Sequence, residues 1–89
     1  MILDAMLDDR RSRYGDFASL SRLSQRMKEP MRLHEGWSRM DSYQREALEM
    51  ILHKVARIVN GDPNYDDSWT DIIGYTQRVI EQLKMERDI

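Results

Sequence analysis

The sequence predicts an all-α fold: a small helical bundle built on a long antiparallel helical hairpin, with two shorter N-terminal helices. Three observations lead to this fold class. Apolar residues recur at steps of three and four along most of the chain, which is the period of an amphipathic helix. Proline and glycine stand between these periodic segments, where turns are expected. No segment shows the alternation of a strand, and no internal repeat or low-complexity segment interrupts the pattern.

The composition indicates one domain, residues 1–89, that needs additional stabilisation. A chain of 89 residues buries a limited core, and the absence of cysteine excludes disulfides. We therefore expect a homo-oligomer. The chain has 14 basic and 16 acidic residues, interspersed, which argues against nucleic-acid binding. The N-terminus lacks a charged segment followed by an apolar one, so we expect a cytoplasmic protein, within a host cell if phage-encoded, and no membrane association.

Residues 1–30 are predicted to form two short helices. The first carries apolar residues at helical spacing and ends before Gly15, since glycine adopts the left-handed conformation that follows many helices. Asp16 is placed to cap the second helix, and Pro30 is expected to end it. Residues 31–41 are interpreted as a connection. The expected apolar face of the second helix consists of Phe17, Leu20, Leu23 and Met27.

The hairpin is predicted over residues 42–86, with helices at 42–60 and 66–86 joined by a turn that contains Pro63. Ser68 and Asp71 match the S-x-x-[DE] capping box at the start of the last helix. The apolar face expected for the helix at 42–60 consists of Ala47, Leu48, Ile51, Leu52, Val55, Ile58 and Val59. That of the helix at 66–86 consists of Trp69, Ile72, Ile73, Tyr75, Val79, Ile80 and Leu83.

Lys54 is the unusual charge in the hairpin because it shares one side of its helix with apolar residues. A buried ammonium needs a carboxylate partner. We therefore predict a polar seam in which Lys54 and Arg57 pair with Asp67 and Asp71. As a structural feature the seam would fix the register of the two helices, and as a functional one it would form the floor of a pocket.

Other polar and aromatic residues allow simpler interpretations. Glu46, Glu49, His53 and Arg57 follow one another at steps of three or four, which is typical of a solvated helix face. The aromatic side chains are typical core residues, although they could stack on a ligand. His34 and His53 lack the spacing of a histidine metal site. No phosphate-binding loop or nucleophile motif is present.

Three segments of the chain together resemble a known family. They are LDDRRSRYGDF at 7–17 and KVARI at 54–58 together with DSWTDIIGY at 67–75. These segments resemble short phage and prophage proteins of unknown function, which are similar in outline to the MazG-like all-α nucleotide pyrophosphatases. The resemblance covers most of the chain and adds Tyr14, Asp16 and Tyr75 to the candidate binding residues.

The pyrophosphatases hold magnesium with four carboxylates on two neighbouring helices. When the hairpins are aligned by their turns, Lys54 and Arg57 fall where the first acidic pair should be. Two cations there would repel the metal. In an alternative register Glu46 and Glu49 lie opposite Asp67 and Asp71, which preserves four carboxylates for Mg²⁺.

Three functions follow as hypotheses. The first is a non-catalytic phage-type accessory protein without a cofactor, an oligomeric binding module for a host protein, such as a component of a host defence system, or for a nucleotide-like ligand. The alternative is a magnesium-dependent MazG-like nucleoside triphosphate pyrophosphatase. The third is a DNA-binding regulator that uses a basic cluster, and the balancing acidic residues argue against it. That cluster consists of Arg10, Arg11, Arg13, Arg22, Arg26 and Lys28.

Overall fold

The computed structural model describes residues 1–88, which fold into four α-helices and one short 3₁₀-helix. The elements are α1 (Ile2–Tyr14), α2 (Phe17–Leu33), η1 (Trp37–Arg39), α3 (Ser42–Asn60) and α4 (Asp67–Arg87). The predicted all-α class and the α3–α4 hairpin are thus confirmed, and no strand occurs in the described part. Over the same residues, no helix combines the length and the apolar character needed to cross a membrane.

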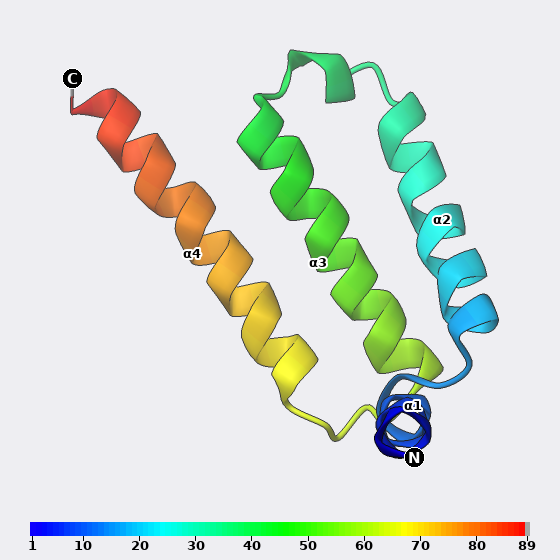
Figure 1. Ribbon diagram of the computed structural model, residues 1–89. Helices are drawn as coiled ribbons and strands as arrows, with labels where there is room; N and C mark the ends of the chain where they lie inside the picture. Colours follow the sequence, from blue (N-terminus) through cyan, green and yellow to red (C-terminus); the bar gives the residue numbers. More distant parts are fainter. Residues whose placement is uncertain (89) are drawn as a thin grey trace.

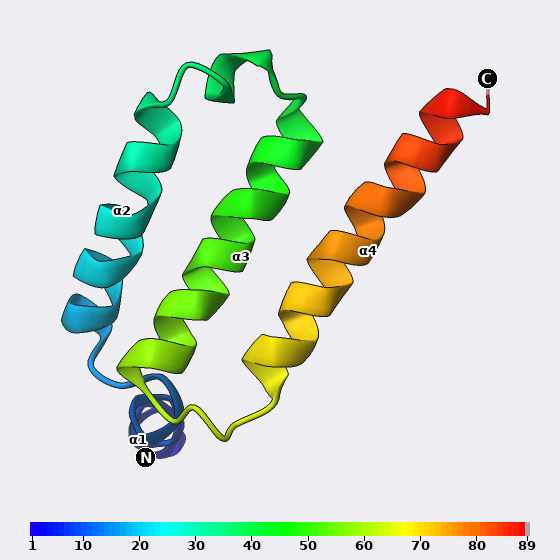
Figure 2. The same ribbon diagram turned by 180° about the vertical axis from the view of Figure 1, so that it is seen from behind.

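The helix packing agrees with the predicted bundle, which here takes the form of an open layer. Helices α2, α3 and α4 lie side by side with α3 in the middle, and α1 is seen end-on at the edge where α3 ends (Figures 1 and 2). The molecule measures 52 × 27 × 23 Å, and its radius of gyration is 15.5 Å. A compact domain of this length would have a radius near 12 Å. The layer therefore leaves two broad faces uncovered.

The core of a single chain is correspondingly thin. The buried apolar residues are Leu20, Ala47, Ala56 and Ile58, and no large side chain is completely buried among the described residues. Ala56 lies on the side of α3 that faces α2, while Ala47 and Ile58 lie on the opposite side, toward α4. Several predicted core residues are instead exposed. They are Phe17, Val59, Trp69, Ile73 and Ile80.

Helical spacing assigns the remaining side chains to two different faces of the layer. On the first, which we call the apolar face, the half-buried Leu48 and the exposed Thr76 line a shared hollow between α3 and α4. Its members are Leu23 and Met27 of α2, Leu48, Leu52, Val55 and Val59 of α3, and Trp69, Ile73, Thr76 and Ile80 of α4. The opposite polar face carries Lys28, Glu46, His53, Arg57, Asp71, Tyr75 and Arg78.

The ends of the first helices follow local backbone chemistry. Helix α1 ends before Gly15, as predicted, but Gly15 has φ +80° and ψ −168°, a positive-φ conformation that favours glycine and differs from the expected left-handed helical one. The side chain of Asp16 accepts a hydrogen bond from the Ser19 backbone N–H at 3.0 Å and so caps α2, which is also confirmed. At α3, the Asp41 backbone N–H donates to Gln44 Oε1 at 2.8 Å.

The prediction that α2 ends at Pro30 is wrong, because the helix continues to Leu33. Pro30 removes one backbone donor, which deprives the Arg26 carbonyl of its helical partner. Both residues are exposed, so water can satisfy that carbonyl. Beyond the proline, Arg32 forms an ion pair with Glu49 of α3, and this tertiary contact holds the last turn in place.

The predicted capping box at the start of α4 is also wrong. Asp66 occupies the N-cap position, and Ser68 lies inside the first turn, where it is buried. Asp71 forms an ion pair with Lys54 instead of capping the helix. The charge on the neighbouring helix therefore outweighs the local motif, since a local cap and a tertiary ion pair compete for the same carboxylate.

Asn60, at the end of α3, holds the α1–α2 turn against the start of the α3–α4 turn. Its Nδ2 donates to the carbonyls of Tyr14 and Asp16 at 2.9 and 3.1 Å, and its Oδ1 accepts from the Ser19 hydroxyl at 2.7 Å. The backbones approach closely at the next residue, since a Cβ placed on Gly61 would overlap the main chain of Arg13 and Tyr14 in the last turn of α1. This junction fixes α1 against the layer.

Replacing Gly61 with alanine is expected to destabilise the protein by about 2 kcal/mol or more, because the added Cβ forces two backbone segments apart. Gly74 is the matched control, since a Cβ there meets no atom within 4 Å. Gly74→Ala is expected to stabilise the protein by about 0.5–1 kcal/mol through helix propensity. Urea unfolding measures both changes, and equal stability of the two variants would contradict the close approach.

Candidate functional site: a basic pocket at the junction of α1, α2 and α3

Of the predicted polar seam, the structure contains the ion pair between Lys54 and Asp71. Lys54 is buried, and its Nζ lies 3.0 Å from Asp71 Oδ2, across the interface of α3 and α4. The Asp71 side chain is 46% exposed, so the pair lies at the rim of the interface rather than in its centre. The ion pair therefore fixes the register of the hairpin, and its carboxylate remains in contact with solvent.

Arg57 does not pair with Asp67, in contrast to the predicted seam. Its guanidinium carbon lies 4.2 Å from the centre of the Tyr14 ring, a cation–π contact that links α3 to α1. Asp67 Oδ2 accepts a hydrogen bond from the Tyr65 hydroxyl at 2.6 Å, and Arg13 donates to the same hydroxyl. The hydrogen bond to Asp67 raises the pKa of Tyr65, and burial raises it further.

The other candidate residues are divided between different parts of the molecule. Asp16 caps α2, and Tyr14 packs against Arg57 and edge-on against Tyr65, with ring centres 6.2 Å apart. Tyr75 lies on α4 beside Asp71 and lines shallow hollows of the polar face. The structure thus brings Tyr14 and Arg57 together, whereas Tyr75 lies near the ion pair of Lys54 and Asp71.

The four carboxylates of the alternative magnesium site do not fit a metal within one chain. Glu49 pairs with Arg32, Asp71 with Lys54, and Asp67 accepts from Tyr65. Glu46 lies apart, exposed on the polar face. No group of three potential ligands from histidine, cysteine, aspartate or glutamate converges anywhere in residues 1–88. Three of these carboxylates already form an ion pair or accept a hydrogen bond from a hydroxyl group. They therefore do not form the acidic cluster that Mg²⁺ requires.

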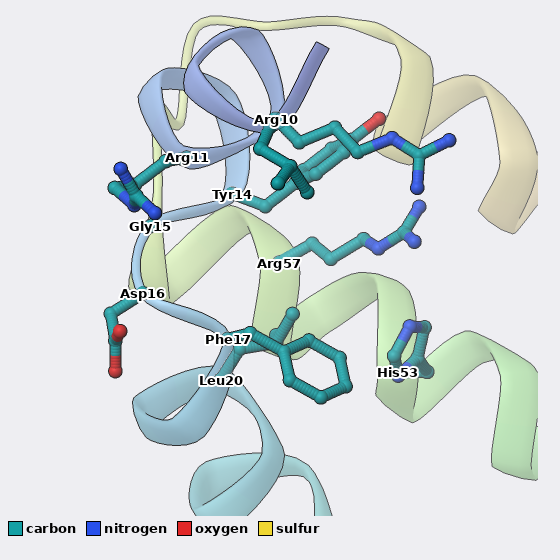
Figure 3. A pocket seen from close by; sticks show the side chains of 10 residues that line it. Arg10, Arg11, Tyr14, Gly15, Asp16, Phe17, Leu20, His53 and Arg57 are labelled. Carbon is teal, nitrogen blue, oxygen red and sulfur yellow. The ribbon is translucent and has the colours of Figure 1, made fainter. Parts of the chain in front are cut away.

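A pocket opens where α1, α2 and the end of α3 meet, and we call it the basic pocket. It has a volume of about 250 Å³, and Figure 3 shows the side chains around it. The guanidinium groups of Arg10 and Arg57 extend toward the same side, whereas Arg11 and Asp16 point away from them. The lining residues are Leu7, Arg10, Arg11, Tyr14, Gly15, Asp16, Phe17, Leu20, His53 and Arg57.

The positive charge in the basic pocket is not neutralised by the protein. Among residues 1–88, neither Arg10 nor Arg57 has a carboxylate within 4 Å, whereas Arg11 pairs with Asp8 at 3.3 Å. The Nε of Arg57 is buried without a hydrogen-bond partner. An unpaired buried donor of this kind costs about 1–3 kcal/mol, more when it is charged. Such an orphaned donor is rare in a folded protein and calls for an explanation, such as a bound water or ion.

The positive charge of the basic pocket affects the pKa of His53. Burial lowers the pKa of His53, and the positive charges of Arg57, Lys28 and Lys54 lower it further. The imidazole also shares the pocket with Arg10 of α1. The folded chain therefore resists protonation of His53 more strongly than the unfolded chain does.

The stability of the protein is expected to fall as the pH drops below about 6.5, the ordinary pKa of histidine, because protons then bind the unfolded chain preferentially. His53→Gln removes this contribution and is expected to lose less stability between pH 7 and pH 5. Urea unfolding at both pH values measures the difference, with His34→Gln, at an exposed position, as the control. Identical losses in wild type and His53→Gln would contradict the prediction.

The sequence pattern alone does not group the residues of the basic pocket. It places Arg10 in a basic cluster, Phe17 in the core and His53 on a solvated helix face. One available signal was spacing, since Arg10 and Tyr14 of α1 are four residues apart, as are His53 and Arg57 of α3. That spacing indicates a shared face within each helix, but the meeting of the two faces depends on the turn at Gly15.

No family model matches the chain, and no similar curated protein or solved structure was found.

Proposed function

We propose that this chain is a non-catalytic binding module that acts as a homodimer, with the apolar faces of two three-helix layers packed together and the polar faces open to ligands. The observation that carries the proposal is the apolar face. Val59, Trp69 and Ile73 are more than half exposed on it, although they belong to the helices that should form the core. A patch of this kind on a small domain is typical of an interface.

The exposed area agrees with a dimer. The accessible surface of the chain is 6641 Å². A compact monomer of 10.7 kDa would expose about 5,500 Å², so this chain exposes roughly 1,100 Å² more. A standard interface buries about 800 Å² on each partner. A second copy of the chain would therefore cover an area close to the excess, and the pairing would be isologous, as in most homodimers.

The position of α1 is compatible with a second copy of the chain on the apolar face. Arg10 and Tyr14 of α1 line the basic pocket with His53 and Arg57, which belong to the polar face. Helix α1 therefore stands on the polar side of the layer and leaves the apolar face open. The host-protein partner implied by the phage resemblance remains a prediction for the polar side.

Sedimentation equilibrium tests the proposal. The wild-type chain is expected to sediment with twice its mass of 10.7 kDa at micromolar concentrations. A single-chain mass at all concentrations up to about 100 µM would overturn the dimer. Turnover of a nucleoside triphosphate by the purified protein would overturn the non-catalytic assignment and favour the pyrophosphatase alternative.

A further inference from the structure

The basic pocket combines uncompensated positive charge with an exposed aromatic ring. Building on the binding module proposed above, we propose that this pocket binds a small phosphate monoester that carries a planar ring. Arg10 and Arg57 bind the phosphate, and Phe17 packs against the ring. The ligand would join α1 to the layer from the polar side, away from the apolar face.

The charge of the pocket selects the phosphate. Arg10 and Arg57 come from different helices, and their guanidinium groups extend to the same side of the pocket (Figure 3). Neither group has a carboxylate partner within the described chain. Guanidinium groups bind phosphate oxygens through paired N–H donors, and two of them balance the charge of a monoester dianion. Asp16 does not compensate them, because its carboxylate caps α2 and points away.

The apolar part of the pocket selects the ring. Phe17 is 76% exposed although it is the first residue of α2, and Leu7 and Leu20 line the same pocket. An exposed phenyl ring beside leucines offers a stacking surface. The volume of about 250 Å³ lies slightly below the usual range for ligand pockets, so it suits one ring and one phosphate better than a larger molecule.

A purely structural role explains only part of this arrangement. The contact of Arg57 with Tyr14 fixes α1 against α3, and this role needs no ligand. It does not use Arg10, which has no carboxylate partner among residues 1–88, or the exposed ring of Phe17. Both side chains belong to exposed residues, so their replacement leaves the packing of the layer unchanged. Variants at these two positions therefore separate ligand binding from folding.

Isothermal titration calorimetry with phenyl phosphate tests the assignment. The wild-type protein is expected to bind one phenyl phosphate per chain, about tenfold more tightly than inorganic phosphate or phenol. Arg10→Gln is expected to weaken binding about tenfold or more, because one charged partner of the phosphate is lost. Phe17→Ser is expected to reduce the affinity to that of inorganic phosphate. Arg22→Gln, at an exposed arginine of α2 outside the pocket, is the matched control and should change affinity less than about twofold.

The outcomes separate this inference from the dimer. Absence of saturable binding at about 10 mM phenyl phosphate would overturn it, as would an equal loss in Arg22→Gln. Benzoate binding as tightly as phenyl phosphate would overturn the choice of phosphate. Binding of a single-stranded oligonucleotide without binding of phenyl phosphate would also overturn it, in favour of an extended nucleic acid. Sedimentation of the same samples reports the dimer separately, so a dimer that binds no phenyl phosphate contradicts only this inference.

Discussion

Replacing Ile73 with glutamate is expected to convert the proposed dimer into a monomer and to raise its dissociation constant about a hundredfold or more. Ile73 lies between Trp69 and Ile80 on the apolar face and is 67% exposed in the single chain. In a monomer the new carboxylate would remain in water, so folding is not at risk. In the dimer it would be buried without a partner, which costs several kcal/mol. Sedimentation equilibrium over a concentration series measures the change.

Arg78→Glu is the matched control for this experiment. It places the same residue type on the same helix, but on the polar face beside Asp71 and Tyr75. We expect the dimer to persist in this variant. Dissociation in Arg78→Glu together with an intact dimer in Ile73→Glu would show that the polar face forms the interface. Both variants are expected to keep their helices, since each substituted residue is exposed in the single chain, and circular dichroism checks this.

Replacing Asp71 with asparagine is expected to lower the free energy of unfolding by about 1–2 kcal/mol, because it leaves the buried Lys54 ammonium without its carboxylate. Breaking a fully buried ion pair costs about 3–5 kcal/mol. The smaller value is expected here since the Asp71 side chain is 46% exposed and water screens the pair. Urea unfolding at neutral pH measures the loss.

Lys54→Met provides the contrast. Methionine is apolar and unbranched, so it fills the same space between α3 and α4 without a charge to compensate. Its stability is expected to lie within about 1 kcal/mol of wild type, or above it. Adding Asp71→Asn to the Lys54→Met variant should then change the free energy of unfolding little. A loss from Asp71→Asn that is unchanged in the Lys54→Met background would show that Asp71 stabilises the protein independently of the ion pair.

The helices themselves could be predicted because they depend on local patterns. The predicted segment 42–60 coincides with α3, and the predicted ends at Gly15 and Asp16 are observed. Pro30 and the Ser68 capping box were misjudged for one shared reason. In both places a tertiary ion pair, Arg32 with Glu49 or Lys54 with Asp71, outweighs a local signal whose energy is only about 1–3 kcal/mol.

The candidate site could be predicted only in part. The burial of Lys54 and its pairing with Asp71 followed from helical spacing, since a charge among apolar positions demands a partner on the next helix. The contact of Arg57 with Tyr14 did not follow from helical spacing. Tyr14 is 43 positions away in the chain and reaches Arg57 only because of the turn at Gly15. Spacing along one helix carries no information about such a crossing.

The sequence by itself determined the all-α class, the α3–α4 hairpin and the charge that one helix presents to the next, because helical periodicity and side-chain chemistry act over a few residues. Only the tertiary structure decided that three helices form an open layer, that this layer has one apolar and one polar face, and that α1 completes a basic pocket on the polar side. The position of α1 depends on the junction at Asn60 and Gly61, where hydrogen bonds and close backbone contact set the direction of this helix. These contacts join residues far apart in the chain, so local sequence patterns do not reveal them.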